Sequence, residues 1–277
     1  MVLVRTITIL LIFSYNLFGA DKVNGYKLVW NDEFEKEGQP DPTKWTYENG
    51  FVRNKELQWY QPENAFCEDG KLVIVGKKVL QPNPHYEPQS HEWQKKREKI
   101  EYTSSCLITK GLHSWQYGRF EVKAKIDIST GLWPAIWFLG VEGEWPSNGE
   151  IDLMEFYKGK LLANLFWGIH DRWKPTINSK TKKVASFNDS TWQDKFHIWR
   201  MDWDENFIRL YVDNILLNEV DLSKTVNATT KRGPKNPFHQ PHYLLLNLAI
   251  GGNAAGEPIG TKFPTRYEID YVRVYKK

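Results

Sequence analysis

The sequence of 277 residues contains only two cysteines, Cys67 and Cys106. Two cysteines allow one disulfide in an oxidising compartment, and two buried free thiols fit the sequence equally well. A disulfide-rich scaffold is therefore excluded. The seven histidines show no spacing such as His-x-x-x-His, which argues against a catalytic metal centre. No cofactor is expected for catalysis.

The sequence also lacks a large excess of charge of either sign. The 37 Lys and Arg residues nearly balance the 34 Asp and Glu residues, which leaves a formal net charge of +3. The densest basic run, Lys95-Lys96-Arg97, is followed at once by Glu98. A solvated loop explains that run better than a nucleic-acid patch does. We therefore expect no nucleic-acid partner.

Long hydrophobic runs are absent after the first 20 residues. Segment 6–13 (TITILLIF) follows Arg5 and precedes Phe18-Gly19-Ala20, an order that is typical of a secretory signal peptide. The apolar segment is too short to span a bilayer. We predict that residues 1–20 are a signal peptide and that residues 21–277, the mature chain, are secreted or periplasmic without a membrane partner.

No segment shows the hydrophobic period of a long amphipathic helix. In residues 118–126, the apolar Phe120, Val122 and Ala124 alternate with charged residues, which predicts a strand with one buried face. Other strand-like segments are 72–77, 105–109, 135–139, 150–156, 161–167, 197–202, 207–212, 243–250 and 267–275. No repeat or linker separates them. This pattern predicts a single all-β domain, an antiparallel two-sheet β-sandwich of jelly-roll type.

Two polar segments, 81–99 and 227–240, are predicted to be long loops. The first contains Pro82, Pro84 and Pro88, which disfavour regular structure. Long loops in compact domains are often functional. These two either form the wall of a cleft or cross the edge of the sandwich.

Residues 148–156 (NGEIDLMEF) place three acids within six positions. Because side chains alternate along a strand, Glu150 and Asp152 share one face. Glu155 reaches that face only if a β-bulge at Leu153-Met154 adds one residue, and bulges recur beside active sites. Neighbouring carboxylates repel each other and raise the pKa of one of them, as a general acid requires. The plainer alternative is the solvated face of a strand.

Tryptophans accompany these acids. Trp133 and Trp137 share strand parity upstream of the acidic segment, and Trp145 also comes before it. Sugar rings present apolar faces that pack on aromatic rings, whereas single-stranded nucleic acid would also need a strongly positive groove. A retaining glycosidase needs two carboxyl groups about 5–5.5 Å apart around the glycosidic bond. Acids and tryptophans together therefore indicate a sugar cleft.

The chain resembles glycoside hydrolase family 16, particularly its laminarinase-like branch. The motifs follow the family order through nearly the whole mature chain. They are 28–34 (LVWNDEF), 54–60 (NKELQWY), 115–122 (WQYGRFEV), 131–137 (GLWPAIW), the Glu-x-Asp-x-x-Glu signature of Glu150, Asp152 and Glu155, and 270–275 (DYVRVY). The resemblance implies a jelly roll with a concave substrate cleft and an endo-acting retaining hydrolase.

The resemblance also implies roles for individual residues. Glu150 would be the nucleophile, Glu155 the acid/base, and Asp152 would orient and tune the pair. The predicted substrate-binding residues are Asn54, Arg119, Trp133, Trp137 and Trp145. A strand-edge salt bridge for Arg119 and core packing for Trp137 are the alternatives.

A structural calcium ion on the convex side, away from the cleft, is a further implication of the resemblance. Its ligands would be Asp270 together with the backbone carbonyls of Glu33 and Gly70. Calcium prefers such hard oxygen ligands, with waters completing its shell. The alternative for Asp270 is an ordinary acid near the end of a strand.

Two departures from the laminarinase pattern concern the substrate. Where laminarinases often carry a histidine-rich strand, this chain has 161–167 (LLANLFW). Gly251-Gly252-Asn253 is followed by Ala254 in place of the tryptophan that many laminarinases have. We predict cleavage of β-1,3- or mixed-linkage β-1,3/1,4-glucan by double displacement. The alternative substrate is a marine β-galactan of the agar, porphyran or carrageenan type.

Two other classes of function share these features. A non-catalytic carbohydrate-binding jelly roll would have a similar aromatic cleft, but it would not need three acids. A transglycosylase would share the chemistry and transfer the sugar to another sugar instead of water. In each case the expected partner is a polysaccharide, and a monomer is expected.

Overall fold

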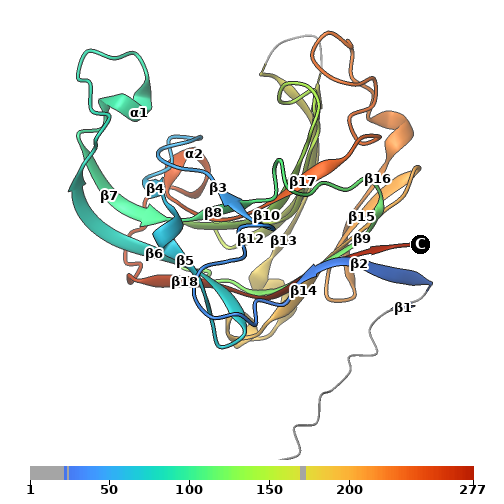
Figure 1. Cartoon of the computed structure of the whole chain (residues 1–277), viewed down its shortest axis with the longest axis horizontal. Coiled ribbons are helices and arrows are strands. Elements are labelled where there is room, and N and C mark those ends of the chain that lie inside the picture. The colour runs from blue at the N-terminus through green and yellow to red at the C-terminus, as the bar shows by residue number, and fades with distance from the viewer. Residues whose placement is uncertain (1–21, 24, 169–172) are drawn as a thin grey trace, which may run out of the picture.

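The computed structural model describes residues 22–23, 25–168 and 173–277. In Figure 1 these residues form two stacked β-sheets, with the smaller sheet on the inside of a U-shaped arrangement and the larger one on the outside. The predicted signal peptide, residues 1–20, lies outside the described residues. Within the described part of the chain, no helix is long and apolar enough to cross a membrane.

The larger sheet contains eleven of the strands in the described ranges. Its main path is β16 (Ile215–Asp221), β15 (Phe207–Val212), β14 (His197–Trp203), β9 (Gly118–Lys125), β18 (Thr265–Lys276), β6 (Lys71–Pro82), β7 (Lys99–Ser104) and β4 (Gln58–Tyr60). The strands β1 (Lys22–Val23), β2 (Tyr26–Asp32) and β5 (Ala65–Glu68) join this path at its sides. This sheet forms the outer, convex layer.

The smaller sheet contains seven strands of the described chain. Its order is β13 (Pro175–Lys183), β12 (Lys160–Gly168), β11 (Glu150–Tyr157), β10 (Leu132–Gly140), β17 (His242–Ile250), β8 (Cys106–Ile108) and β3 (Thr46–Tyr47). All its pairs are antiparallel. The predicted two-sheet jelly roll is therefore confirmed. In the larger sheet, β4 and β7 pair in parallel and depart from the antiparallel pattern.

Helices are short wherever the structure describes them. They are α1 (Trp93–Lys96), α2 (Gly252–Ala255), η1 (Pro62–Asn64), η2 (Val184–Phe187), η3 (Trp192–Asp194) and η4 (Leu222–Lys224). The strand β13 was not predicted, because Pro175 and several lysines give its sequence the character of a loop. It forms one edge of the smaller sheet, where lysines discourage pairing with other chains.

The core lies between the two sheets. Phe120 and Val122 of β9 face inward from the larger sheet, and Phe138 and Leu153 face inward from the smaller one. All nine residues of β17 are buried, because a second cluster around Tyr60 covers its other face. The smaller sheet is thus packed on both faces close to β11, the strand that carries the acids.

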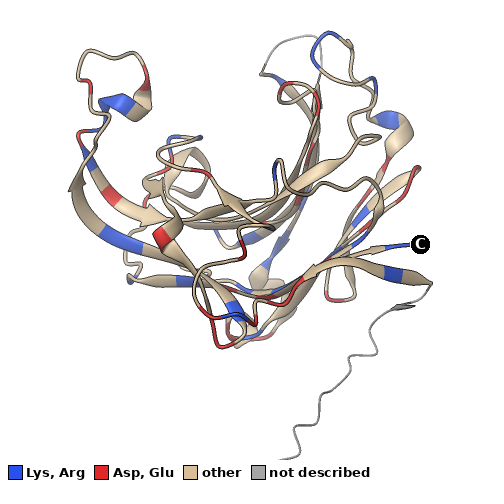
Figure 2. Cartoon of the chain, viewed as in Figure 1, with Lys and Arg blue, Asp and Glu red and all other residues tan. Residues whose placement is uncertain are grey.

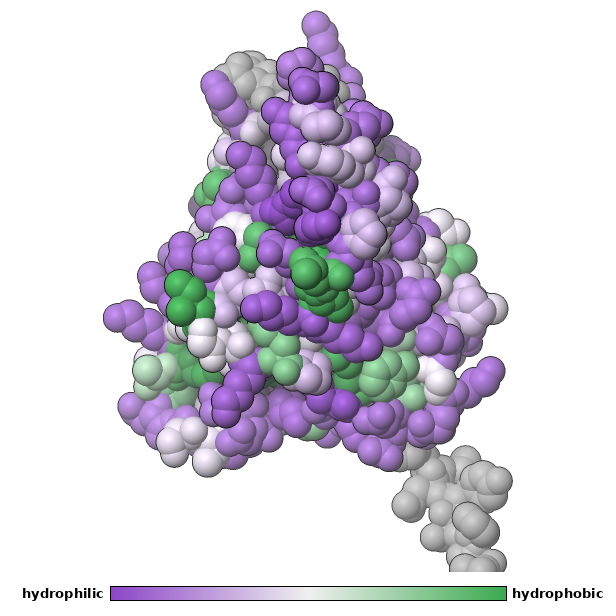
Figure 3. Space-filling model, turned by 90° about the vertical axis from the view of Figure 1, so that its left-hand side faces the viewer, coloured by the Kyte–Doolittle hydropathy of each residue, from purple (hydrophilic) through white to green (hydrophobic). Residues whose placement is uncertain are grey.

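The surface carries mixed charges. Figure 2 shows Lys and Arg alternating with Asp and Glu over the larger sheet and the loops, and a mostly uncharged ribbon across the smaller sheet. The face above β6, β7 and α1 is largely hydrophilic, with hydrophobic residues that stand apart from one another (Figure 3).

The two cysteines do not form a disulfide. Cys67 lies in β5 of the larger sheet and Cys106 in β8 of the smaller sheet, and both are buried free thiols. The sequence left open either one disulfide or two buried free thiols, and the structure contains the two free thiols. Burial raises the pKa of the Cys67 thiol to about 11, so this group stays protonated at neutral pH and acts as a small apolar side chain.

Candidate active site

A groove of about 760 Å³ crosses the concave face of the smaller sheet. Strands β10, β11, β12, β13 and β17 supply most of its lining, and a loop around residues 53–56 completes one end. Seven of the predicted site residues line it, and they are Asn54, Trp133, Trp137, Trp145, Glu150, Asp152 and Glu155. The other lining residues include Arg53, Glu56, Tyr157, Asn164, Phe166, Trp173, Ile177, Ser179, Asn247 and Ala254.

A β-bulge in β11 brings the three acids onto one face. Asp152 pairs with Asn164 of β12, but the next paired residue of β11 is Glu155, opposite Leu162. The chain therefore advances three residues on β11 and two on β12. Leu153 and Met154 are both fully buried, so the bulge turns two successive side chains into the core and returns Glu155 to the groove. The predicted bulge at Leu153-Met154 is present.

Gly149 sets the start of the acidic strand. Its φ of +79° lies in the left-handed region that favours glycine. A Cβ atom at this position would come within 2.8 Å of Pro237 and 3.2 Å of the His242 ring. Any larger residue would therefore displace either the backbone or its neighbours, and with them Glu150.

Two indole N–H groups bind the carboxylates of Glu150 and Glu155, the first and last of the three acids. Trp145 Nε1 donates a hydrogen bond to Glu150 Oε2, and Trp133 Nε1 donates to Glu155 Oε1 at 2.7 Å. A hydrogen bond to a carboxylate stabilises its ionised form and fixes its direction. The tryptophans therefore position the two acids as well as lining the groove.

Asn164 bridges Asp152 and Glu155. Its Nδ2 lies 3.0 Å from Asp152 Oδ2 and 2.9 Å from Glu155 Oε2, and donates to both. Ser179 Oγ donates to Asn164 Oδ1 at 2.5 Å from the neighbouring strand β13. Neither Asn164 nor Ser179 was predicted from the sequence, although an Asn among the apolar residues of 161–167 is a signal of a polar contact.

The acids share a strongly perturbed environment. Burial, together with the charge of Glu150, raises the pKa of Glu155 to about 7. Burial between two carboxylates raises the pKa of Asp152 well above its ordinary value. Burial also raises the pKa of Glu150, opposed by hydrogen bonds from Trp145 and Asp152. Near neutral pH the site can therefore hold one ionised and one protonated glutamic acid, as acid/base catalysis requires.

The loop at the other end of the groove is held by charge and stacking. The Arg53 guanidinium forms a salt bridge with Glu48 and lies 4.9 Å from the centre of the Trp137 ring. Trp137 is 8% exposed and donates its N–H to Asn247 Oδ1 at 2.7 Å. Trp137 thus combines the two roles that the sequence left open, because it packs in a buried cluster and also lines the groove.

A family comparison agrees with this geometry. The profile described as "Glycosyl hydrolases family 16" matches residues 54–273, most of the chain. The chain belongs to glycosyl hydrolase family 16. The resemblance inferred from the sequence motifs is therefore confirmed, and the three acids lie within the matched range.

Family 16 relatives with different substrates are about equally similar. The chain is 34% identical to "Beta-glucanase" of Rhodothermus marinus, over 93% of this chain and 87% of that protein. It is 32% identical to "Glucan endo-1,3-beta-glucosidase A1" of Niallia circulans, over 92% of this chain but only 38% of that protein. It is 31% identical to "Keratan-sulfate endo-1,4-beta-galactosidase" of Sphingobacterium multivorum, over 91% of this chain and 55% of that protein. The chain thus spans well under two thirds of two of these three family 16 relatives.

Solved family 16 structures show the same fold. A laminarinase catalytic domain from Thermotoga petrophila RKU-1 has a TM-score of 0.75 at 31% identity, covering 92% of this chain and 99% of that one. A structure from work on endo-acting O-glycanases that human gut microbiota members express to initiate mucin breakdown has a TM-score of 0.82 at 35% identity. That match covers 91% of each chain. The chain is therefore a family 16 glycoside hydrolase.

One predicted substrate-binding residue lies elsewhere in this family 16 fold. Arg119 is on β9 of the larger sheet, outside the groove lining. Its guanidinium binds the Asp202 carboxylate through two hydrogen bonds, of 2.6 and 3.0 Å, and lies over the ring of Tyr26. The alternation of β9 turns Phe120 into the core and Arg119 outward, so Arg119 forms the structural salt bridge that was its alternative. The placement of Arg119 in the sugar subsites was wrong.

The predicted calcium site stays a prediction. On β18, Val272 pairs with Asp32 and Ile269 pairs with Leu72, so Glu33 and Gly70 lie one and two residues along the chain from partners that flank Asp270. The Asp270 carboxylate forms a 2.6 Å ion pair with Lys123. Among the described residues, no three His, Cys, Asp or Glu side chains cluster as a metal site. One carboxylate with two carbonyls still fits calcium, provided that the ion displaces Lys123.

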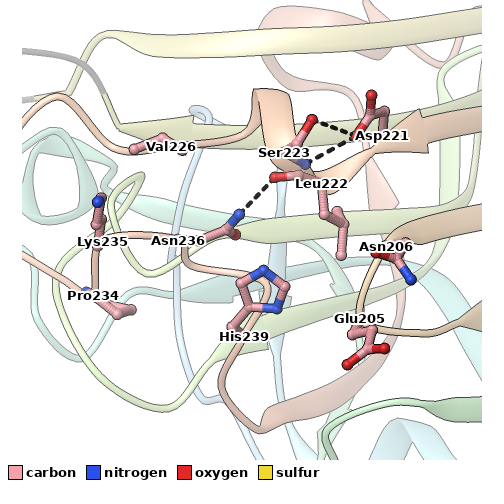
Figure 4. A pocket seen from close by; sticks show the side chains of 10 residues that line it. All are labelled: Glu205, Asn206, Asp221, Leu222, Ser223, Val226, Pro234, Lys235, Asn236 and His239. Atoms are coloured by element: carbon pink, nitrogen blue, oxygen red, sulfur yellow. Dashed lines mark hydrogen bonds between the residues drawn. The ribbon is translucent and has the colours of Figure 1, made fainter.

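The two predicted loops do not line the groove. Segment 227–240 lines a separate cavity of about 550 Å³ together with η4 and the end of β16 (Figure 4). There, Asp221 accepts hydrogen bonds from Ser223, and Asn236 donates to the Leu222 carbonyl, so the polar groups bind one another. Segment 81–99 contains α1 and the ends of β6 and β7. It forms an arm that is fastened to the groove loop, as described below.

Proposed function

We propose that this family 16 chain is an endo-acting retaining glycoside hydrolase that cleaves β-1,3- or mixed-linkage β-glucan by double displacement. The observation that carries this proposal is the arrangement of Glu150, Asp152 and Glu155 on one face of β11. Glu150 and Glu155 each have their own indole N–H donor, and Asn164 donates to both Asp152 and Glu155.

In the first step, the Glu150 carboxylate attacks the anomeric carbon. Glu155 passes its proton to the glycosidic oxygen, the bond between that oxygen and the anomeric carbon breaks, and a glycosyl ester forms on Glu150. A pKa of about 7 keeps Glu155 protonated below neutral pH. The hydrogen bond from Trp145 favours the ionised form of Glu150.

In the second step, the Glu155 carboxylate accepts a proton from water. The water oxygen attacks the anomeric carbon from the face that the leaving group vacated, and Glu150 departs as a carboxylate. Two inversions give net retention. Asp152 shares the groove face of β11 with both glutamates, and burial together with the charges of Glu155 and Glu150 raises its pKa.

The acids of an inverting enzyme lie about 6.5–9.5 Å apart, with a water between them. Here Glu150 and Glu155 lie on one face of the same strand, and the charge of Glu150 acts on Glu155, which supports the closer spacing of a retaining pair. Proton NMR of early products should therefore show the β-anomer first. Initial appearance of the α-anomer would contradict the assignment of Glu150 as nucleophile.

A second substrate class, a glycan with β-galactoside linkages, is favoured by a specific feature of the groove. Phe166 and Ile177 are directly paired across β12 and β13, and Ile177 is 52% exposed. Trp173, 59% exposed, stacks on Trp145 with ring centres 6.0 Å apart. This apolar wall suits a glycan that carries methyl groups, such as the N-acetyl groups of keratan sulfate or mucin chains. The keratan-sulfate and O-glycanase relatives support the same class.

The experiment is a panel of polysaccharides with detection of new reducing ends. The panel contains laminarin, mixed-linkage glucan, agarose, porphyran, carrageenan, keratan sulfate and mucin. Glu150→Gln and Glu155→Gln serve as inactive controls. Activity on laminarin or mixed-linkage glucan supports the first substrate, and activity confined to keratan sulfate or mucin supports the second. Binding without cleavage by the wild type would instead indicate a non-catalytic carbohydrate-binding protein.

The proposal includes secretion. Residues 1–20 have the features of a signal peptide, and an enzyme that acts on polymers too large to enter a cell has to meet them outside it. N-terminal sequencing of protein from the culture medium or periplasm should show a mature chain that begins near residue 21. Recovery of the uncleaved chain from the cytoplasm alone would contradict secretion.

A further inference from the structure

The amide of Asn164 is the contact that joins the acid/base to the rest of the sheet. Asn164 of β12 is paired with Asp152 of β11 on one side and with Ser179 of β13 on the other, so the three side chains form one row across three strands. Asn164 has two amide hydrogens, and each has an acceptor. One lies on Asp152 Oδ2 at 3.0 Å and the other on Glu155 Oε2 at 2.9 Å.

Ser179 determines which way this amide points. Its hydroxyl donates to Asn164 Oδ1 at 2.5 Å. If the amide were flipped, its oxygen would face two carboxyl groups and its NH₂ would face the hydroxyl. Only the observed orientation gives each acid a donor, and the Ser179 hydroxyl stabilises that orientation. The donor set of Glu155 thus depends on a residue two strands away.

The charged and titratable groups around Glu155 are few. Glu150, Asp152 and Tyr157 lie on the same strand, and Tyr157 pairs with the end of β12. Strand β10 contributes the neutral indole of Trp133 and β12 the neutral amide of Asn164. Arg53 acts from the loop on Glu150. Within the described residues, the contacts from neighbouring strands to Glu155 are therefore donated by groups that do not titrate.

We propose that the Asn164–Ser179 pair is a positioning unit that orients Glu155 and stabilises its ionised form in the second step of the reaction. This inference rests on the proposed function and identifies residues within it. Glu155 has to cycle between a protonated and an ionised state in each turnover. The amide binds the ionised state more strongly, so it opposes the effects of burial and of the Glu150 charge. Asn does this without an ionisation of its own, whereas a histidine at this position would add one.

The test compares four variants. Asn164→Ala removes the bridge, Ser179→Ala removes its orientation, and Ser179→Thr keeps a hydroxyl at the same place. Thr181→Ala is the matched control, since Thr181 is exposed, follows Ser179 with the same parity on β13 and lies outside the groove lining. Each variant is compared with the wild type by melting temperature and by the pH dependence of kcat/KM.

The expected result is a graded change in the basic limb of the pH profile. A hydrogen bond to a charged group is worth about a 10- to 100-fold effect, so Asn164→Ala should lower kcat/KM by roughly that factor. Its basic limb should move to higher pH, because the ionised form of Glu155 loses a donor and its pKa rises. Ser179→Ala should shift the limb in the same direction by less. Ser179→Thr, which keeps the hydroxyl, should shift it less than Ser179→Ala does, and Thr181→Ala should match the wild type.

A second readout does not depend on turnover. Carbon-13 NMR of labelled glutamate carboxyls follows the titration of Glu155 directly, with the signal assigned from Glu155→Gln. The pKa of Glu155 should be higher in Asn164→Ala and in Ser179→Ala than in the wild type. An unchanged titration in both variants, or an equal change in Thr181→Ala, would overturn the proposal. Failure of the proposed function would appear separately, as a wild type that cleaves no glycan in the panel.

Discussion

At the scale of single residues, two tryptophans make separate contacts with the two glutamates that we propose to be catalytic. Trp133→Phe should raise the pKa of Glu155 and move the basic limb of kcat/KM to higher pH, since the ionised form loses its indole donor. Trp145→Phe should instead raise the pKa of Glu150 and move the acidic limb upward. Each lost bond to a charged group should lower kcat/KM by about 10- to 100-fold. A shift of the same limb in both variants would contradict the assigned roles.

Glu155 also gives a stability prediction. Burial and the charge of Glu150 raise its folded pKa from 4.5 to about 7. Because the pKa of this carboxyl is higher in the folded chain, its contribution to stability is fully present at pH values below its pKa in the unfolded chain. The contribution is lost as the pH rises through the folded pKa of about 7. Glu155→Gln should therefore raise the melting temperature at pH 8, by an amount equivalent to roughly 1–3 kcal/mol, and change it little at pH 4. The exposed Glu205→Gln is the control. An equal gain at both pH values would show that the charge is not the cause.

The sequence identifies residues by parity and motif, but it does not say which sheet they belong to. Parity correctly joined Glu150 and Asp152 and required the bulge that returns Glu155. The same reasoning placed Arg119 on the outer face of its strand, but that face proved to be the convex one, where Asp202 of β14 lies opposite. Asn164 was missed because its role depends on the register between β11 and β12, and Trp173 was missed because its role depends on stacking against Trp145.

At the scale of elements, the arm formed by β6, α1 and β7 supports the loop at one end of the groove. Arg97, at the end of α1, donates hydrogen bonds of 2.7 Å to the carbonyls of Lys55 and Glu56. Its guanidinium also lies 4.8 Å from the ring centre of Phe51 and 5.0 Å from that of Trp93. The loop thus fastened carries Asn54 and Glu56, which line the groove.

Arg97→Ala should therefore raise KM more than it lowers kcat, because the binding loop is loosened while the three acids stay in place. Arg97→Lys should not restore the wild-type KM, since an ammonium group lacks the planar fork that reaches two carbonyls and stacks on rings. Steady-state kinetics on the best polymer of the panel measures both constants. A fall in kcat with unchanged KM would show that the arm acts on the catalytic strands instead.

The elements themselves were predictable to different degrees. Strand β15 was predicted with its observed bounds, and the acidic strand β11 ends one residue later than expected. In both segments, apolar residues either alternate with polar ones or form a run, and these patterns are typical of a buried or half-buried strand. Strand β13 lacks such a pattern, since one of its faces lines the groove and its free edge faces solvent. Its strand conformation is stabilised by nine residue pairs with β12, a long-range cause that no local pattern contains.

At the scale of the whole molecule, the proposed calcium site joins three strands of the outer sheet. If calcium binds only the folded chain, a concentration of 100 times Kd should add about 2.7 kcal/mol to the free energy of unfolding. The melting temperature should then be higher in calcium than in chelator, and Asp270→Asn should abolish the difference. Lys123→Ala should strengthen calcium binding, because it removes the competing ion pair. Equal melting temperatures of the wild type in calcium and chelator would refute the site.

The width of the groove determines how the molecule meets a polymer. Its lining extends from Asn247 on β17 across β10, β11 and β12 to Ile177 on β13. Four strand spacings amount to about 19 Å, which is several sugar rings, and β13 is an edge of the sheet. A site of this shape binds the middle of a chain, so the viscosity of a polymer solution should fall before many reducing ends appear. Release of only mono- or disaccharides from the first moments, at unchanged viscosity, would exclude endo-action.

The same width predicts how affinity is distributed along the polymer. Each aromatic contact adds about 0.5–1.5 kcal/mol, so useful affinity needs several occupied positions. Trp173 is 59% exposed and contributes little to folding. Trp173→Ala should thus lower kcat/KM on long chains with an unchanged melting temperature. Binding at distant positions also contributes to distortion at the reacting sugar, so short oligosaccharides should lose kcat as well as affinity. A variant with full activity on long polymers would show that the substrate does not reach β13.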